Sequence, residues 1–140
     1  MKTTALAITL STTTMITFIC SYFFNLSMDH YEQYLALISV IFVDGFFGVI
    51  AGTKREGFQT RKAIKVLRTA ATWILLLTVL LSVEKGFRGT DWLSETILIP
   101  FLLFQIISAL KNASMAGFIH AKALNRILDA LDSHKGDRES

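Results

Sequence analysis

The chain has 140 residues, of which 52% are hydrophobic and only 18% charged, compared with roughly 25% charged in an ordinary soluble protein. The net charge is +3, and the basic residues lack the interleaved aromatic surface, finger spacing or RNA-binding signature of a nucleic-acid-binding protein. One cysteine cannot form an internal disulfide, and three scattered histidines give no metal-ligand spacing. The composition therefore favours a membrane protein with no metal, cofactor or nucleic acid partner.

The first apolar stretch covers residues 3–28 and carries no charge. At about 1.5 Å per residue, a helix of this length crosses the roughly 30 Å hydrocarbon core of a bilayer. Lys2 ahead of an apolar run also suits a signal peptide, but the run is long and lacks a convincing small-x-small cleavage site. We expect an uncleaved helix. Its many hydroxyls can bond to its own carbonyls or to a neighbouring helix: Thr9, Ser11, Thr12, Thr13, Thr14 and Thr17.

The second apolar stretch, residues 33–53, contains a single acid, Asp44. A charge near the middle of a bilayer costs about 2.5–3.5 kcal/mol on insertion scales, so Asp44 should face protein or water. Gly48 and Gly52 follow at four-residue intervals on the same helix face, and the G-x-x-x-G spacing permits close helix contact. Two interpretations stay open for Asp44: a structural carboxyl that joins helices, or a residue that lines an aqueous passage.

A strongly basic connection follows the second stretch. Short loops rich in Lys and Arg stay on the cytoplasmic side of a membrane, and such a segment beside an apolar helix faces anionic lipid headgroups. We therefore predict headgroup contacts for the six basic residues of this connection: Lys54, Arg55, Arg61, Lys62, Lys65 and Arg68.

The third and fourth apolar stretches, residues 69–83 and 96–110, are shorter between charges. A helix of that length measures only about 22 Å, so spanning would require snorkelling side chains or a thinner bilayer. On the fourth stretch, Gln105, Ser108 and Asn112 recur at i, i+3 and i+7 and form a polar stripe. Polar side chains in lipid require partners, so the stripe should meet another helix, through bonding alone or while lining a pore.

The segment after Lys111 has a different pattern. Small or apolar residues recur at spacings of four and three, with Lys122, Arg126 and Asp129 off the stripe, which predicts an amphipathic helix on a neighbour or on the membrane surface. We therefore divide the chain into a transmembrane helical domain, residues 1–112, and a cytoplasmic amphipathic helix and tail, residues 113–140.

Topology follows from the basic residues. Apart from Lys85 and Arg88, every Lys and Arg falls in the amino end, the second connection or the tail. Four spans place these three segments on one side, which the charge bias assigns to the cytoplasm. The predicted fold is therefore all-α: a multi-pass membrane protein with about four transmembrane helices, a C-terminal amphipathic helix and both termini cytoplasmic.

Enzyme signatures are missing from the sequence. It contains no His-Glu-x-x-His zinc motif, no phosphate-binding glycine loop followed by Lys, and no nucleophile elbow. We therefore predict a protein that is not an enzyme and has no catalytic residue.

From Asp44 onward the chain resembles the toxin-secretion/phage lysis holin family. Members carry an acid and a glycine in an early span, as Asp44 and Gly48 do here, followed by a basic, glycine-containing connection like residues 57–68. A late family segment reads Glu-x-x-Ser-Ile-x-Glu-Asn with a glycine about five residues on. Residues 105–112 followed by Gly117 are similar at the same spacing, with Gln105 and Lys111 where the family usually has acids. The resemblance covers roughly residues 40–131.

The resemblance implies a homo-oligomer that forms lesions in the bacterial inner membrane and releases a peptidoglycan hydrolase or a toxin. In that hypothesis Asp44, Gly48, Gly52, Gln105, Ser108 and Asn112 line the pore or make helix contacts, and the basic connection binds anionic lipids. Two other hypotheses remain open at this point. One is a small transporter or proton-conducting subunit centred on Asp44, and the other is a membrane anchor that recruits a soluble partner through its tail.

Overall fold

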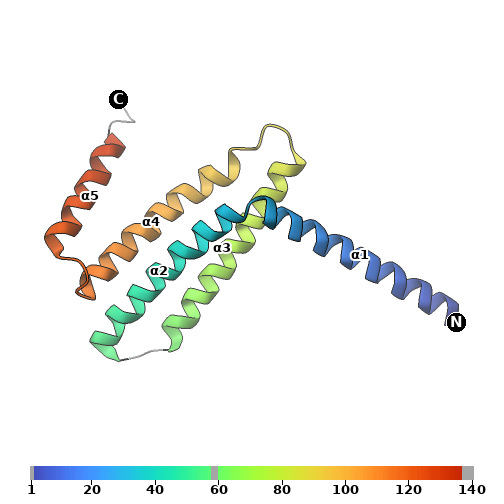
Figure 1. Cartoon of the computed structure of the whole chain (residues 1–140), viewed down its shortest axis with the longest axis horizontal. Helices are drawn as coiled ribbons and strands as arrows, with labels where there is room; N and C mark the ends of the chain where they lie inside the picture. The colour runs from blue at the N-terminus through green and yellow to red at the C-terminus, as the bar shows by residue number, and fades with distance from the viewer. Residues whose placement is uncertain (1, 58–59, 137–140) are drawn as a thin grey trace.

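The computed structural model describes the backbone of residues 2–57 and 60–136; the side chains of residues 2, 3, 5–7, 55, 56, 135 and 136 lie outside this description. The described part of the chain is helical, as the sequence predicts. Its helices are α1 (Lys2–Asp29), α2 (Tyr31–Glu56), α3 (Thr60–Gly86), α4 (Leu93–Met115) and α5 (Ala121–Gly136). Helices α2, α3 and α4 run side by side as an up-and-down bundle, with α1 and α5 attached to its opposite ends (Figure 1).

Three helices of the described residues are long and apolar enough to cross a membrane: Tyr31–Lys54, Thr60–Gly86 and Leu93–Met115. Helices α3 and α4 are longer than the uncharged stretches because each continues through flanking charged residues. At about 1.5 Å per residue, the 27 residues of α3 measure about 40 Å. Both helices are therefore long enough to cross a bilayer if the flanking charged side chains extend to the headgroups.

The core of the bundle lies toward the end that carries the α1–α2 and α3–α4 connections. Six buried aliphatic side chains from all four of the first helices meet there: Leu26, Leu37, Ile41, Leu77, Leu81 and Leu98. Trp73 of α3 stacks on Phe101 of α4 with ring centroids 3.4 Å apart, next to this cluster. Glu84 accepts hydrogen bonds from the backbone N–H (2.6 Å) and the hydroxyl (3.1 Å) of the buried Ser94, so the end of α3 caps the start of α4.

Helix α1 projects away from the bundle (Figure 1). Every described side chain from residue 8 to residue 25 is exposed, and only Leu26 reaches the core. Lys85 of α3 holds the junction, because its ammonium lies 3.2 Å from the Asp29 carboxylate and 5.8 Å from the centre of the Tyr22 ring. The predicted first span is thus a helix, although α1 is not one of the three helices that meet the length and hydropathy criteria in the described part of the chain.

Helix α5 has the amphipathic pattern that the sequence predicts. Leu124, Leu128 and Leu131 are half-buried, whereas Lys122 and Arg126 are exposed. A turn at Gly117, whose φ of +87° suits glycine, redirects the chain between α4 and α5.

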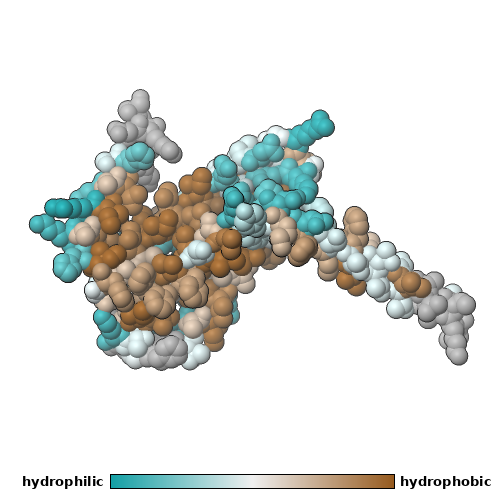
Figure 2. Space-filling model, viewed as in Figure 1, coloured by the Kyte–Doolittle hydropathy of each residue, from teal (hydrophilic) through white to brown (hydrophobic). Residues whose placement is uncertain are grey.

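The surface is apolar around the middle of the bundle. Figure 2 shows hydrophobic residues across the bundle, with hydrophilic residues gathered at the end with the α3–α4 connection and along α5. Large aliphatic and aromatic side chains are exposed on all three bundle helices, among them Phe42, Leu75 and Phe104. An apolar belt between two polar ends matches a bilayer rather than water.

Candidate functional site: a polar pocket inside the apolar bundle

Asp44 is joined to a neighbouring helix in the bundle. Its Oδ1 accepts a hydrogen bond of 2.9 Å from the side-chain amide of Asn112, so the acid of α2 meets the polar stripe of α4. Both side chains are partly buried. A carboxylate with a donor from protein avoids part of the cost of contact with lipid, which explains how α2 carries an acid in its apolar sequence.

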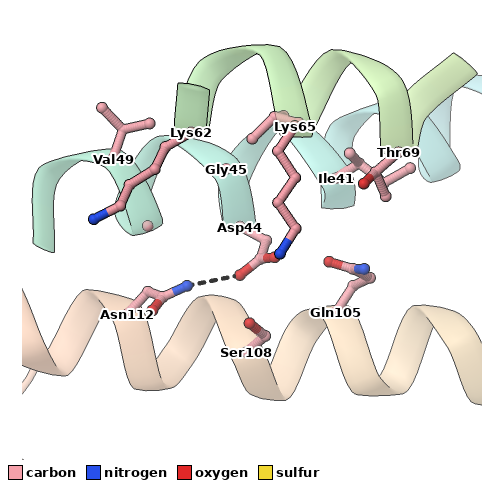
Figure 3. Close-up of a pocket in the computed structure, with 12 residues that line it drawn as sticks. Ile41, Asp44, Gly45, Val49, Lys62, Lys65, Thr69, Gln105, Ser108 and Asn112 are labelled. Atoms are coloured by element: carbon pink, nitrogen blue, oxygen red, sulfur yellow. Dashed lines mark hydrogen bonds between the residues drawn. The ribbon is translucent and has the colours of Figure 1, made fainter. Parts of the chain in front are cut away.

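A pocket of about 410 Å³ surrounds this hydrogen bond and opens at the protein surface. It is lined by all three bundle helices, and this volume has room for several water molecules. The lining residues are Ile41, Asp44, Gly45, Gly48 and Val49 of α2, Lys62, Lys65, Val66 and Thr69 of α3, and Gln105, Ser108 and Asn112 of α4. We call this site the polar pocket (Figure 3).

Five of the six residues predicted to line a pore or make helix contacts meet at the polar pocket. Asp44 and Gly48 come from α2, and the whole stripe of Gln105, Ser108 and Asn112 comes from α4. The sixth, Gly52, is not among the lining residues of the pocket. Their role as the lining of a water-filled passage stays a prediction.

Two lysines of the basic connection also line the pocket. Lys65 extends toward the Asp44 carboxylate, and Lys62 lies along the same opening (Figure 3). A Cβ added at Gly52 would come within 2.6 Å of the Lys62 ammonium, so this glycine leaves space for the Lys62 side chain. Lys65 is exposed and Lys62 is half-buried at this opening, so their predicted contact with lipid headgroups stays a prediction.

The other basic residues of this connection have different surroundings. Arg61 and Arg68 are exposed on α3, where they are accessible to lipid headgroups. Lys54 donates a hydrogen bond to the carbonyl of Ala116, which joins the end of α2 to the end of α4. The Arg55 side chain lies outside the described residues, so its predicted headgroup contact has no structural counterpart.

Gly45 is a contact residue that the sequence interpretation missed. It is buried, and a Cβ at this position would lie 2.5 Å and 2.6 Å from the two terminal carbons of Val66. Helix α3 therefore packs closely against α2 at Gly45, a glycine outside the predicted G-x-x-x-G pair. By comparison, a Cβ at Gly48 would be 3.3 Å from the Asn112 amide nitrogen, a tight contact with α4.

The chemistry of the polar pocket is hydrogen bonding and charge compensation. Two ammonium groups and one carboxylate, together with two amides and two hydroxyls, are brought into an otherwise apolar bundle. Among the described residues, no group of three His, Cys, Asp or Glu side chains is placed to hold a metal ion. The pocket therefore suits water, ions or the polar side chains of another helix.

The comparison with protein families shows to which family this helical bundle belongs. The model of the bacteriophage holin family matches residues 19–133, which include all three bundle helices and the polar pocket. The chain belongs to the bacteriophage holin family. No curated protein and no solved structure matches the chain.

The holin match starts earlier in the chain than the resemblance seen in the sequence. It begins at residue 19, in the second half of α1, and so includes the junction at which Asp29 meets Lys85. Holins are typically membrane proteins without enzymatic activity, in agreement with the expectation that this chain is not an enzyme. Family membership and the three apolar helices together make this a holin-like, membrane-embedded protein.

Proposed function

We propose that this holin assembles into homo-oligomers in the bacterial inner membrane and permeabilises it, which permits a peptidoglycan hydrolase or a toxin to leave the cytoplasm. In this proposal both termini lie in the cytoplasm, α1 is a fourth span, and the exposed basic residues contact anionic headgroups. The observation that carries the proposal is the polar pocket, which sits in an apolar bundle of a holin.

Physical reasoning links the pocket to assembly. A pocket with charged and amide groups that opens at a lipid-facing surface is costly, because lipid offers these groups no hydrogen bonds. Contact with another copy, or with water enclosed by several copies, provides those partners. Assembly that surrounds water converts this unfavourable surface into the lining of a lesion.

A leakage assay with purified protein tests the proposal. We expect the full chain to release a trapped dye from vesicles that contain anionic lipid. The triple variant Gln105→Leu, Ser108→Ala, Asn112→Leu, which removes the polar stripe of α4, should release much less dye. Glu95→Gln is the matched control, because it removes an exposed acid at the start of α4, away from the pocket. Full leakage by the triple variant would show that permeabilisation does not depend on the polar pocket, which would contradict the proposal.

A further inference from the structure

The projecting helix α1 carries hydroxyl groups along one face. Thr9, Thr13 and Thr17 recur every four residues and therefore lie on the same side of the helix. Thr13 donates a hydrogen bond to the carbonyl of Thr9 (2.8 Å), and Thr17 donates one to the carbonyl of Thr13 (2.9 Å). A threonine that donates to its own helix keeps oxygen lone pairs that can accept further hydrogen bonds.

The polar pocket offers the complementary groups. The ammonium groups of Lys62 and Lys65 and the amide of Gln105 are donors at an opening of the bundle. Helix α1 carries no charged residue between Lys2 and Asp29, so placing it over the pocket buries no additional charge. Lys65 of the pocket and both Thr13 and Thr17 of α1 are exposed in the single chain.

The two sets of groups also match in depth when α1 and α4 both span the membrane. Their starting level is shared, because Leu26 near the end of α1 and Leu98 near the start of α4 lie in one core cluster. Measured from Leu26, Thr17, Thr13 and Thr9 lie about 14, 20 and 26 Å along α1 at about 1.5 Å per residue. Measured from Leu98, Gln105, Ser108 and Asn112 lie about 10, 15 and 21 Å along α4. Thr17 thus lies within about 2 Å of the depth of Ser108, and Thr13 within about 2 Å of the depth of Asn112.

The chain's own α1 does not reach this position. It leaves the bundle and is held at the junction by Lys85, which contacts both Asp29 and Tyr22 (Figure 1). Helices α1 and α2 are separated only by His30, so little chain is available to carry α1 around the bundle to the pocket. A neighbouring copy can receive α1 without breaking these contacts.

We infer that the hydroxyl face of α1 from one copy packs over the polar pocket of the next copy, between its α3 and α4. This inference rests on the proposed function, since it requires α1 to span the membrane and the chain to assemble. Each copy then uses α1 as one half of the contact and the pocket as the other half. Such a head-to-tail contact builds closed rings or open rows of subunits, rather than stopping at a dimer.

Disulfide crosslinking in intact inner membranes tests this contact. The full chain is used with its native Cys20 replaced (Cys20→Ser), and two differently tagged copies are expressed together. One copy carries Thr13→Cys and the other carries Asn112→Cys. Oxidation should join the two tagged chains, because facing Cβ atoms about 3.5–4.5 Å apart can form a disulfide.

Thr14→Cys provides the matched control. Residue 14 is also an exposed threonine that bonds to its own helix, at nearly the same depth, but it points about 100° away from Thr13 around the helix axis. We expect little or no product between Thr14→Cys and Asn112→Cys. A product from both pairs in similar amount would indicate random collision in the membrane and overturn the inference.

Other outcomes overturn it as well. A chain that carries both Thr13→Cys and Asn112→Cys and crosslinks within itself would show that α1 covers its own pocket. No product from either pair would show that lipid or another surface occupies the pocket. Dye leakage by the same variants before oxidation is measured in parallel, so leakage without the crosslink rejects this contact and leaves the proposed function standing.

Discussion

At the scale of single residues, the central feature is that Asp44 is tolerated in an apolar helix because α4 supplies a hydrogen-bond donor for its carboxylate. Asn112 donates a hydrogen bond to it, and Lys65 extends toward it (Figure 3). These contacts need α2, α3 and α4 to be in register. The polar pocket therefore contributes to the specificity of helix packing as well as to any contact with water.

The Asp44–Asn112 hydrogen bond should be measurable as a coupling between the two residues. We expect Asp44→Ala and Asn112→Ala each to lower the free energy of unfolding in detergent. A double-mutant cycle should give a coupling of about 0.6–1.7 kcal/mol, the range observed for hydrogen bonds between membrane helices. Glu95→Ala combined with Asn112→Ala is the control and should show no coupling. Zero coupling between Asp44→Ala and Asn112→Ala would show that this hydrogen bond does not form in the folded protein in detergent.

Asp44→Asn separates a lesion from a proton pathway. Asparagine keeps a carbonyl oxygen that can accept the Asn112 hydrogen bond, but it cannot carry a charge or release a proton. We expect the variant to assemble and still release a trapped dye from vesicles. A different result would support a transporter centred on Asp44: the unchanged protein releases no dye but carries a selective proton flux, and Asp44→Asn abolishes that flux.

At the scale of helices, the close approach of α2 and α3 depends on Gly45. A larger side chain there must displace Val66, so Gly45→Val should destabilise the bundle by about 1–3 kcal/mol, as overpacked cores do. Unfolding in detergent measures the loss. The second-site change Val66→Ala should restore much of it, and Gly86→Ala is the control because no atom lies within 4 Å of a Cβ at that position. An unaffected Gly45→Val protein would contradict this packing.

Helix α5 distinguishes a lesion former from an anchor. Helix α4 runs to Met115, Ala116 accepts a hydrogen bond from Lys54, and the Phe118 ring contacts Phe47 of α2, so a truncation that keeps residues 1–118 retains these contacts of the bundle. We expect this truncated chain still to collapse the membrane potential, with altered timing. Lys122→Ala, an exposed change on α5, should leave the timing close to that of the full chain. If the truncated chain still inserts but leaves the membrane potential unchanged, the result would favour a membrane anchor that recruits a soluble partner through its tail.

Much of this arrangement follows from the sequence, and the exceptions have a common cause. Hydrophobic stretches predict α2, α3 and α4, and the spacing of Gln105, Ser108 and Asn112 predicts a shared polar face. An apolar stretch, however, ends at the first charged residue, whereas a helix continues while its backbone hydrogen bonds are favourable. Helices α3 and α4 are therefore longer than the apolar stretches that predict them. The role of Gly45 and the position of Lys62 and Lys65 at the polar pocket depend on which helices are neighbours, which local patterns do not specify.

At the scale of the whole molecule, a largely apolar surface and an aliphatic core accompany one open polar pocket. Figure 2 shows the apolar surface on the face that it draws. A single subunit of this kind has groups that lipid cannot satisfy and an α1 helix that packs against little of its own chain. Both features favour assembly in the membrane, which is the behaviour we propose for this holin.

The most direct test of this account is the inner-membrane potential of bacteria during induced expression of the full chain. We predict that the potential collapses once the protein accumulates in the membrane, and that a co-expressed peptidoglycan hydrolase then reaches the cell wall and lyses the cells. The variant that lacks the polar stripe of α4, expressed to the same membrane level, should leave the potential intact for longer. A full potential in cells whose inner membrane holds abundant wild-type protein would contradict the account.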